Sequence, residues 1–342
     1  MTTAAATGRR AWAGRAVSVD EVAGRLAELR RPADGGQPLS LAAVLNLVAY
    51  APADEELPAM RSTIELLADH QPSLAVLVRE DDDGDGLDAE ALSHCGTGGR
   101  PACVAVELVV LRLGAGMRGG AASAVAPLLR TGLPTFLWWP GAPSPEGDAP
   151  PARLVAMADR VVTEAGRAAD GPAGVRALAA WAPGCGAAVT DLGWAAITTW
   201  RQLIAQVLDR RGLDDLRAGH GAVAVGHGGA VPPVDALLLA GWLADLIGPR
   251  SMIEMRPERP SAHRIAAIEL TGARSGRTMT IRRLPGRHAA EVRVDGPGGA
   301  QRRTLPLPRL DRASLLAGEL ELQRRDPVFE RAVAAAAALA AG

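Results

Sequence analysis

Acidic residues that could bind a metal ion begin at Asp81. Positions 81–86 read Asp-Asp-Asp-Gly-Asp-Gly, which is the spacing of the first half of a calcium loop, D-x-D-x-D-G. The twelfth position of such a loop supplies a bidentate Glu, and in this chain it is Leu92. The preceding segment also has the composition of a strand rather than a helix. We therefore predict a solvated acidic turn at a strand end and no metal site.

Two of the three cysteines, Cys95 and Cys103, lie near His94 in the sequence. A zinc site takes about four ligands, usually in pairs separated by two to four residues. Here seven residues separate the two cysteines, and Cys185 follows 82 positions later. Reduced thiols are the default expectation for so few cysteines. Cys95 and Cys103 are nevertheless candidates for a reversible redox pair.

Several kinds of catalytic site are excluded by composition. The chain contains no lysine, and its 37 basic residues are all arginine. Schiff-base enzymes, P-loop nucleotide triphosphatases and Ser-Lys hydrolases all need a lysine. The motifs H-E-x-x-H, G-x-S-x-G and C-x-x-C are also absent. Positions 219–229, rich in Gly and His, hold only fragments of a phosphate loop and are interpreted as a linker.

Arginine could still bind an anionic metabolite, because its guanidinium group holds phosphate through two parallel hydrogen bonds. Most of the 37 arginines must be surface charge, since they balance 38 acidic residues. One functional alternative is therefore an enzyme or sensor that binds a sugar phosphate through arginines in a pocket of the α/β domain.

The aromatic residues are few, and they are concentrated. The chain has seven Trp, two Phe and one Tyr, and Trp138 and Trp139 are adjacent in the segment PTFLWWPG that ends at Pro140 and Gly141. Two prolines fence an apolar run, which predicts one short buried strand. Adjacent strand residues point to opposite faces, so both rings can be buried only in a central strand covered on both sides. We predict that one Trp is core and that the other lies at or near a partner-facing edge.

A second aromatic group surrounds the best predicted helix, 199–211. Trp194 and Trp200 flank its start, and Arg201 follows directly. Trp and Arg are common anchors of protein interfaces. The alternative is that these rings fill a core otherwise made of Ala, Val and Leu.

These two segments resemble the glucose-6-phosphate dehydrogenase assembly protein family, OpcA, of actinobacteria and cyanobacteria. The family patterns run approximately as PLL-x-LPV-x-WWPG and DLAW-x-R-x-T-x-W-R, and the chain has matching residues at 127–141 and 191–201. The resemblance extends over about residues 38–335. The chain departs from the family at Leu74, where the pattern H-P-S-R has Arg, at Gly193, which replaces Ala, and at Ala196, which replaces another Arg.

The resemblance implies a protein that is not an enzyme and has no cofactor. It implies that glucose-6-phosphate dehydrogenase, the first enzyme of the oxidative pentose phosphate pathway, is the partner whose assembly or active form it promotes. In cyanobacterial members of the family, thiol redox state modulates this effect. The motif positions carried over as candidates for partner binding are Trp138, Trp139, Pro140, Gly141, Asp191, Trp194, Thr198, Trp200 and Arg201.

The elements that must position these residues form two groups. Strands are predicted at 41–51, 74–78, 104–113, 135–139 and 159–163, and helices alternate with most of them. Helices at 199–211 and 234–247 follow, and then a β-meander from 265 to 305 and two helices at 311–324 and 327–341. This order predicts a mixed α/β and α+β chain, with helices packed on an N-terminal sheet and a C-terminal domain of helices plus an antiparallel meander. The predicted division is 1–37 (tail and helix), 38–188 (α/β domain) and 189–342 (α+β domain).

Composition limits the setting in which the protein acts. The formal net charge is −1, which argues against a nucleic-acid partner. No apolar run reaches the ~18 residues needed to span a membrane, and the N-terminal segment lacks the apolar region of a secretory signal. We expect a cytoplasmic protein with no membrane partner.

Overall fold

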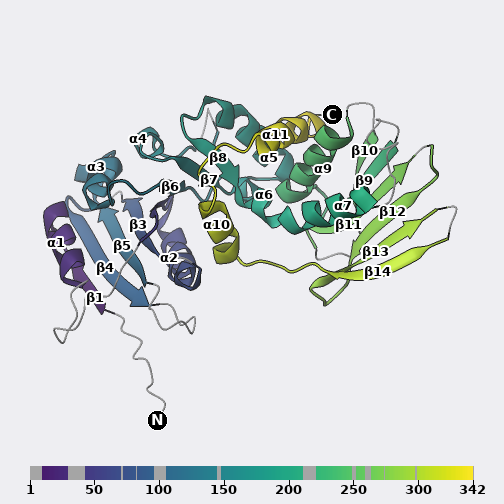
Figure 1. Ribbon diagram of the computed structural model, residues 1–342. Coiled ribbons are helices and arrows are strands. Elements are labelled where there is room, and N and C mark those ends of the chain that lie inside the picture. Colours follow the sequence, from purple (N-terminus) through teal and green to yellow (C-terminus); the bar gives the residue numbers. More distant parts are fainter. Residues whose placement is uncertain are drawn as a thin grey trace, which may run out of the picture.

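The computed structural model describes residues 10–29, 43–70, 72–81, 83–95, 105–144, 148–210, 221–248, 252–258, 263–272, 274–296 and 299–341. Within them, strands gather into an eight-stranded and a six-stranded sheet, with a layer of helices between the two (Figure 1). The sequence-based expectation of a mixed α/β fold with a C-terminal meander is confirmed.

The first sheet has the strand order β1-β4-β5-β3-β2-β6-β7-β8. Its six strands from β5 to β8 are mutually parallel, whereas β4 runs antiparallel to β5 and β1 antiparallel to β4. The strands are β1 (Arg10–Gly14), β2 (Asn46–Tyr50), β3 (Ser73–Glu80), β4 (Leu87–Cys95), β5 (Ala105–Leu113), β6 (Thr135–Trp138), β7 (Arg160–Thr163) and β8 (Ala188–Asp191).

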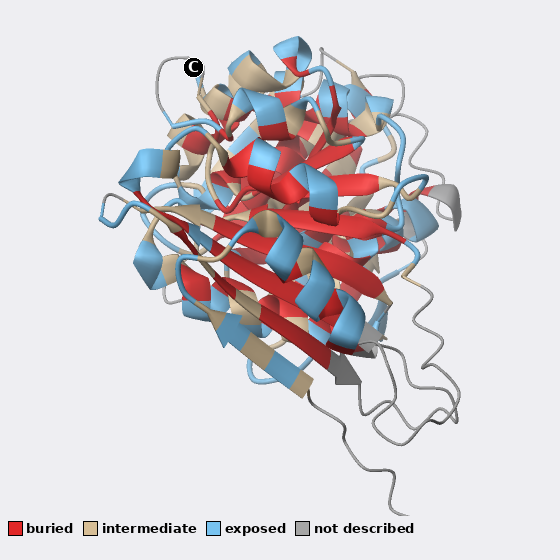
Figure 2. Ribbon diagram, turned by 90° about the vertical axis from the view of Figure 1, so that its left-hand side faces the viewer, coloured by how far each residue is buried: buried red, intermediate tan, exposed pale blue. Residues whose placement is uncertain are grey.

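Both faces of this sheet are buried, which is why its central strands are apolar throughout. Side chains alternate between two cores: Phe136 and Trp138 of β6 enter one, and Leu137 enters the other. Helices α1 (Val19–Leu29), α3 (Ala121–Val125), α4 (Ala152–Val155) and α5 (Gly171–Trp181) cover the Leu137 face, and α2 (Leu57–Leu66) and α10 (Arg312–Leu320) cover the Trp138 face. Figure 2 shows the buried strands between helices whose outer residues are exposed.

The second sheet has the order β10-β9-β11-β12-β13-β14. Strands β9 and β10 are parallel, β11 is antiparallel to β9, and β11 to β14 form the predicted antiparallel meander. Strand β9 lies in positions 219–229, so the interpretation of that segment as a linker is wrong. Its strands are β9 (Gly221–His227), β10 (Met252–Pro257), β11 (Ile265–Gly272), β12 (Thr278–Arg283), β13 (Ala289–Asp295) and β14 (Gln301–Pro306).

Helices connect the two sheets. Short α6 (Leu192–Ala196) and long α7 (Thr198–Arg210) follow β8, and α9 (Val234–Ile247) packs against α11 (Pro327–Leu339) and α5. Helix α9 is apolar on nearly all sides because it is enclosed by these neighbours, and Leu237, Leu238 and Leu239 are all buried. At Gly241 the contact with α11 is so close that an added Cβ would lie 2.2 Å from the carbonyl oxygen of Ala332.

After the second sheet the chain returns to the first sheet, where α10 is hydrogen-bonded to strands β7 and β8. Arg160 of β7 donates from Nη2 to Glu319 Oε2 of α10 at 2.9 Å, and Thr190 Oγ1 donates to the same oxygen at 2.8 Å. Arg160 also donates from Nη1 to the Arg324 carbonyl at 2.6 Å. This buried network fixes α10 against the end of the sheet.

The structure differs from the sequence-based expectation at several strands. The predicted N-terminal tail contains β1, and β4 follows the acidic turn at 81–86 in a segment where no strand is predicted. Strand β8 is not expected from the sequence, and the proposed boundary between 188 and 189 falls inside it. These segments contain Ala, Gly and polar residues whose strand conformation comes from pairing with a neighbour rather than from their own composition.

The strand order of the first sheet determines which of its strand ends face the C-terminal half of the chain. The chain moves from β2 outward through β3, and later resumes on the other side of β2 at β6. In such sheets ligands bind outside the carboxyl ends of the parallel strands. Glu164, just after β7, and Asp191, at the carboxyl end of β8, line a cleft whose other lining residues include Asp235, Ile265 and Arg283 from the C-terminal half of the chain.

Candidate functional site

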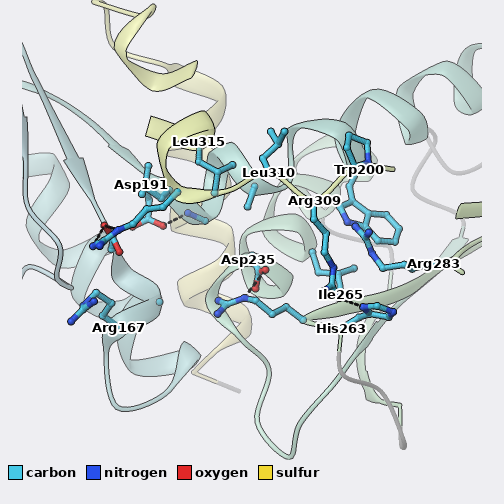
Figure 3. Close-up of a pocket in the computed structure, with 18 residues that line it drawn as sticks. Arg167, Asp191, Trp200, Asp235, His263, Ile265, Arg283, Arg309, Leu310 and Leu315 are labelled. Atoms are coloured by element: carbon cyan, nitrogen blue, oxygen red, sulfur yellow. Dashed lines mark hydrogen bonds and ion pairs between the residues drawn. The ribbon is translucent and has the colours of Figure 1, made fainter. Parts of the chain in front are cut away.

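A cleft of about 530 Å³ separates the carboxyl edge of the first sheet from the second half of the chain (Figure 3). One wall consists of the residues that follow β7 and β8 together with the start of α10. The other wall is formed by the start of α9, the beginning of β11, the end of β12 and positions 308–310. The size lies within the range of small-molecule sites.

Glu164, directly after β7, organises the first wall. Its Oε1 accepts a hydrogen bond from Trp138 Nε1 at 2.8 Å and two from Arg312, from Nε at 2.9 Å and from Nη2 at 2.6 Å. The Arg312 guanidinium also lies over the Trp138 ring, 4.6 Å from its centroid. Trp138, Glu164 and Arg312 thus form one cluster of an aromatic ring, a carboxylate and a guanidinium group from three separate segments of the chain. Arg167, on the same wall, forms an ion pair with Glu56.

Asp191, at the end of β8, is fully buried and begins helix α6. It accepts hydrogen bonds from the backbone N–H of Ala165 at 2.6 Å and of Gly193 at 2.7 Å, and from Thr163 Oγ1 at 2.8 Å. Burial raises its pKa to about 6 against the effect of these donors. Since its oxygens are occupied by protein donors, Asp191 acts as a scaffold for the edge of the sheet.

The second wall carries most of the positive charge. Arg264 donates from Nε to Asp235 Oδ2 at 2.8 Å. Arg283 donates from Nη1 to the Leu307 carbonyl at 3.0 Å and lies over the Trp200 ring at 5.6 Å. Figure 3 shows Arg283, Arg309 and His263 together beside Trp200, away from Arg167.

The basic side chains His263, Arg283 and Arg309 of the second wall lie close enough to interact electrostatically. Arg309 is hydrogen-bonded to His263 through Nη2 and the imidazole Nδ1. Burial, together with the charges of Arg309 and Arg283, lowers the pKa of His263. Burial and the charge of Arg309 also lower the pKa of Arg283. Positive charge is therefore concentrated at this end of the cleft.

The predicted partner-facing Trp is not exposed. Trp138 is 0% and Trp139 is 4% exposed, so the expectation that one of them lies at a partner-facing edge is wrong. Trp138 is buried because β6 lies inside the sheet and is covered on both faces. Trp139, just beyond the strand, stacks on Tyr50 with ring centroids 5.6 Å apart.

The two residues after the Trp pair serve the same packing. Pro140 is buried, and Gly141 is partly exposed. An added Cβ at Gly141 would lie 2.5 Å from Trp139 Nε1, so this glycine makes room for the ring. Residues 138–141 are therefore a packing motif in this chain.

The second predicted group, from Trp194 to Arg201, joins α6 and α7 to the C-terminal helix. Trp194 and Trp200 are both 2% exposed. Trp194 Nε1 donates to Asp326 Oδ2 at 3.1 Å, and its ring contacts Phe329 at 5.5 Å between centroids. Arg201 lies over the Trp194 ring at 3.7 Å and donates to Thr198 Oγ1 at 3.0 Å. Burial lowers the pKa of Arg201.

The structure thus brings only part of the predicted site to the cleft. Asp191 and Trp200 line it, and Trp138 supports it from behind through Glu164. Trp194 is hydrogen-bonded to Asp326, which is not one of the lining residues. Reasoning from sequence misses His263, Arg283 and Arg309, which are separated along the chain and look like many other basic positions among 37 arginines. No spacing pattern in the sequence marks them.

The cysteine and metal predictions are tested only in part. Cys103 and the side chain of Cys95 lie outside the described residues. Cys185 is a free, buried thiol whose pKa is raised by burial. Within the described ranges, His, Cys, Asp and Glu form no group of three or more that could hold a metal ion. The helices described in these ranges are all too short or too polar to cross a bilayer.

Comparison with known proteins identifies the family. Two family models match, and both describe a glucose-6-phosphate dehydrogenase subunit: the model of its N-terminal domain matches residues 65–180, and the model of its C-terminal domain matches residues 187–333. The chain belongs to the OpcA family. A comparison with individually curated proteins found no significant match.

The two OpcA domain matches meet near β8, between the WWPG segment and the D-L-x-W segment. Each of these segments makes a buried contact across the molecule, Trp138 toward the start of α10 and Trp194 toward the start of α11. The WWPG segment therefore holds the N-terminal sheet to α10, and the D-L-x-W segment holds α6 to α11.

Proposed function

We propose that this protein is a non-enzymatic assembly factor and activator that binds glucose-6-phosphate dehydrogenase. The observation that carries the proposal is the ordered match to both domain models of this family, over residues 65–180 and 187–333. The protein would act in the cytoplasm and support the oxidative pentose phosphate pathway, where that enzyme works.

The arrangement of the cleft supports a binding role. Glu164, Asp191 and Asp235 are the carboxylates of its lining, and each is already hydrogen-bonded to a protein donor. These three carboxylates therefore help to hold the walls of the cleft in place.

The candidate partner-binding residues would act mainly as supports. Trp138, Trp139, Trp194 and Trp200 are buried, so they contribute to binding by fixing the two sheets in one arrangement. Thr198, Arg201 and Gly141 are partly exposed and remain candidates for direct contact. A rigid surface of this kind reduces the ordering cost of association.

Activation follows from differential affinity. A partner shifts an enzyme toward the state that it binds more tightly, and the shift is limited by the ratio of the two affinities. Raising the active population from about one tenth to about nine tenths requires about 80-fold preference, or about 2.6 kcal/mol.

The test combines kinetics with association. The apparent KM for glucose 6-phosphate and the kcat of the purified dehydrogenase are measured with and without this protein, and the mixture is analysed by size-exclusion chromatography. We expect co-elution and a lower KM or a higher kcat, and no such effect from an equal concentration of an unrelated protein. If neither parameter changes and the two proteins elute separately, the proposal is wrong.

A further inference from the structure

The cleft holds more positive than negative charge. Its lining includes five arginines, Arg167, Arg264, Arg283, Arg309 and Arg312, against the three carboxylates of Glu164, Asp191 and Asp235. Five against three leaves a formal excess of two positive charges, with His263 counted as neutral. A concave site with one sign of charge attracts ligands of the other sign.

Three of these arginines are paired with acids. Arg312 is bound to Glu164, Arg264 to Asp235, and Arg167 to Glu56 from outside the cleft. Among the described residues, Arg283 and Arg309 have no carboxylate within 4.0 Å. Arg283 and Arg309, next to His263, are therefore the lining arginines whose charge is not paired with a described carboxylate.

Arg283 is held in place before any ligand arrives. One of its terminal nitrogens donates to the Leu307 carbonyl at 3.0 Å, and its guanidinium lies over the Trp200 ring. Arg309 is likewise oriented by its hydrogen bond to His263. An arginine fixed in this way loses little side-chain entropy on binding an anion, and its remaining N–H donors match phosphate oxygens.

The position of the cleft places a ligand between the two halves of the chain. Its first wall lies at the carboxyl ends of β7 and β8, two strands beyond the point between β2 and β6 where the strand order of the sheet reverses. Its volume of about 530 Å³ accommodates a metabolite rather than a single ion. The neighbouring carboxylates Asp235 and Glu164 provide acceptors for hydroxyl groups.

We propose that this cleft binds a small phosphorylated, hydroxyl-bearing metabolite, with its phosphate group held by Arg283, Arg309 and His263. The site lies between the two halves of the chain, whereas the sequence-based alternative places an arginine pocket within the α/β domain. This binding is independent of the proposed association with the dehydrogenase. It is tested on the protein alone.

The experiment is isothermal titration of the full chain with glucose 6-phosphate, with glucose as the matched probe that lacks the phosphate, and with inorganic phosphate. We expect saturable binding of glucose 6-phosphate, weaker binding of phosphate and none of glucose. Arg283→Gln and Arg309→Gln should each weaken binding about 10- to 100-fold, because each removes charged hydrogen bonds. The control Arg293→Gln changes an exposed arginine of β13 that pairs with Asp295 outside the cleft, and it should bind as the wild type does.

Thermal unfolding of each variant establishes that it is folded before titration. Absence of saturable binding of glucose 6-phosphate and phosphate to the folded wild type overturns the proposal. Undiminished binding in the folded Arg283→Gln/Arg309→Gln double variant overturns it as well. If neither probe binds but the variants lose association with the dehydrogenase, the cations contact an acidic segment of that protein; this proposal then fails and the proposed function stands.

Discussion

Replacing Glu319 by Leu should destabilise the protein strongly, because it leaves a buried arginine without its charge partner. Arg160 is 0% exposed, and its Nη2 lies 2.9 Å from Glu319 Oε2. Thr190 Oγ1 would lose its acceptor at the same time. Breaking a buried ion pair by removing one partner costs about 3–5 kcal/mol.

This cost can be expressed as a melting temperature. An unfolding entropy of about 2.1 cal/mol/K per residue, over 342 residues, gives about 0.7 kcal/mol/K. The expected fall in Tm is therefore about 4–7 °C for Glu319→Leu. The measurements are differential scanning calorimetry and urea unfolding followed by circular dichroism.

Two variants separate the effect of charge from that of packing. Glu321→Leu makes the same chemical change at an exposed position just beyond α10 and should stay within about 0.5 kcal/mol of the wild type. Arg160→Met/Glu319→Leu removes both charges and should recover most of the loss, because an apolar pair of similar volume often replaces a buried ion pair without cost. If Glu319→Leu costs less than about 1 kcal/mol, or if the double variant is as unstable as the single one, the reasoning is refuted.

Three further predictions concern the same framework. Gly241→Ala should lower the free energy of urea unfolding by about 1–3 kcal/mol or more, because its Cβ would lie 2.2 Å from the Ala332 carbonyl oxygen. The control Gly318→Ala lies on the open side of α10 and should raise that free energy by up to about 1 kcal/mol. Equal effects of the two substitutions would contradict this prediction. Asp191 has its pKa raised from 3.8 to about 6 in the folded state, so the folded protein binds more protons than the unfolded chain between pH 4 and 6. Its contribution to stability should fall by about 3 kcal/mol as pH rises through that window, and the unfolding free energy of Asp191→Asn, measured against pH, should lack this component. Trp194→Phe should cost about 1 kcal/mol by removing the hydrogen bond to Asp326, and a loss below about 0.3 kcal/mol would show that the bond is unimportant.

Elements with strong periodicity or firm boundaries can be predicted from the sequence. Helix α9 has the predicted bounds, Val234–Ile247, because a continuous apolar run begins after a proline and ends before a glycine. The four strands of the meander follow the prediction because Gly-rich turns separate alternating segments. The Trp138 strand lies in the interior of the sheet and is covered on both faces, which is the condition that the sequence analysis set for burying both rings.

Other strands could not be predicted because their stability comes from their neighbours. Strand β4 contains Asp88, Glu90 and Ser93, and it is a strand because β5 and β1 pair with its two edges. Strand β8 contains only four residues between a helix and a buried cap at Asp191. In both segments, hydrogen bonds to distant parts of the chain outweigh local propensity.

The sequence by itself determined the family, most of the elements and the two motif segments at 127–141 and 191–201. The tertiary structure alone decided that Trp138 and Trp139 are interior, and that His263, Arg283 and Arg309 meet in one cleft beside Trp200. Burial and charge density depend on which distant segments cover a residue. Periodicity reports the face on which a side chain lies, whereas the packing of α10, α11 and the second sheet against that face determines whether it meets solvent, a core or other cations.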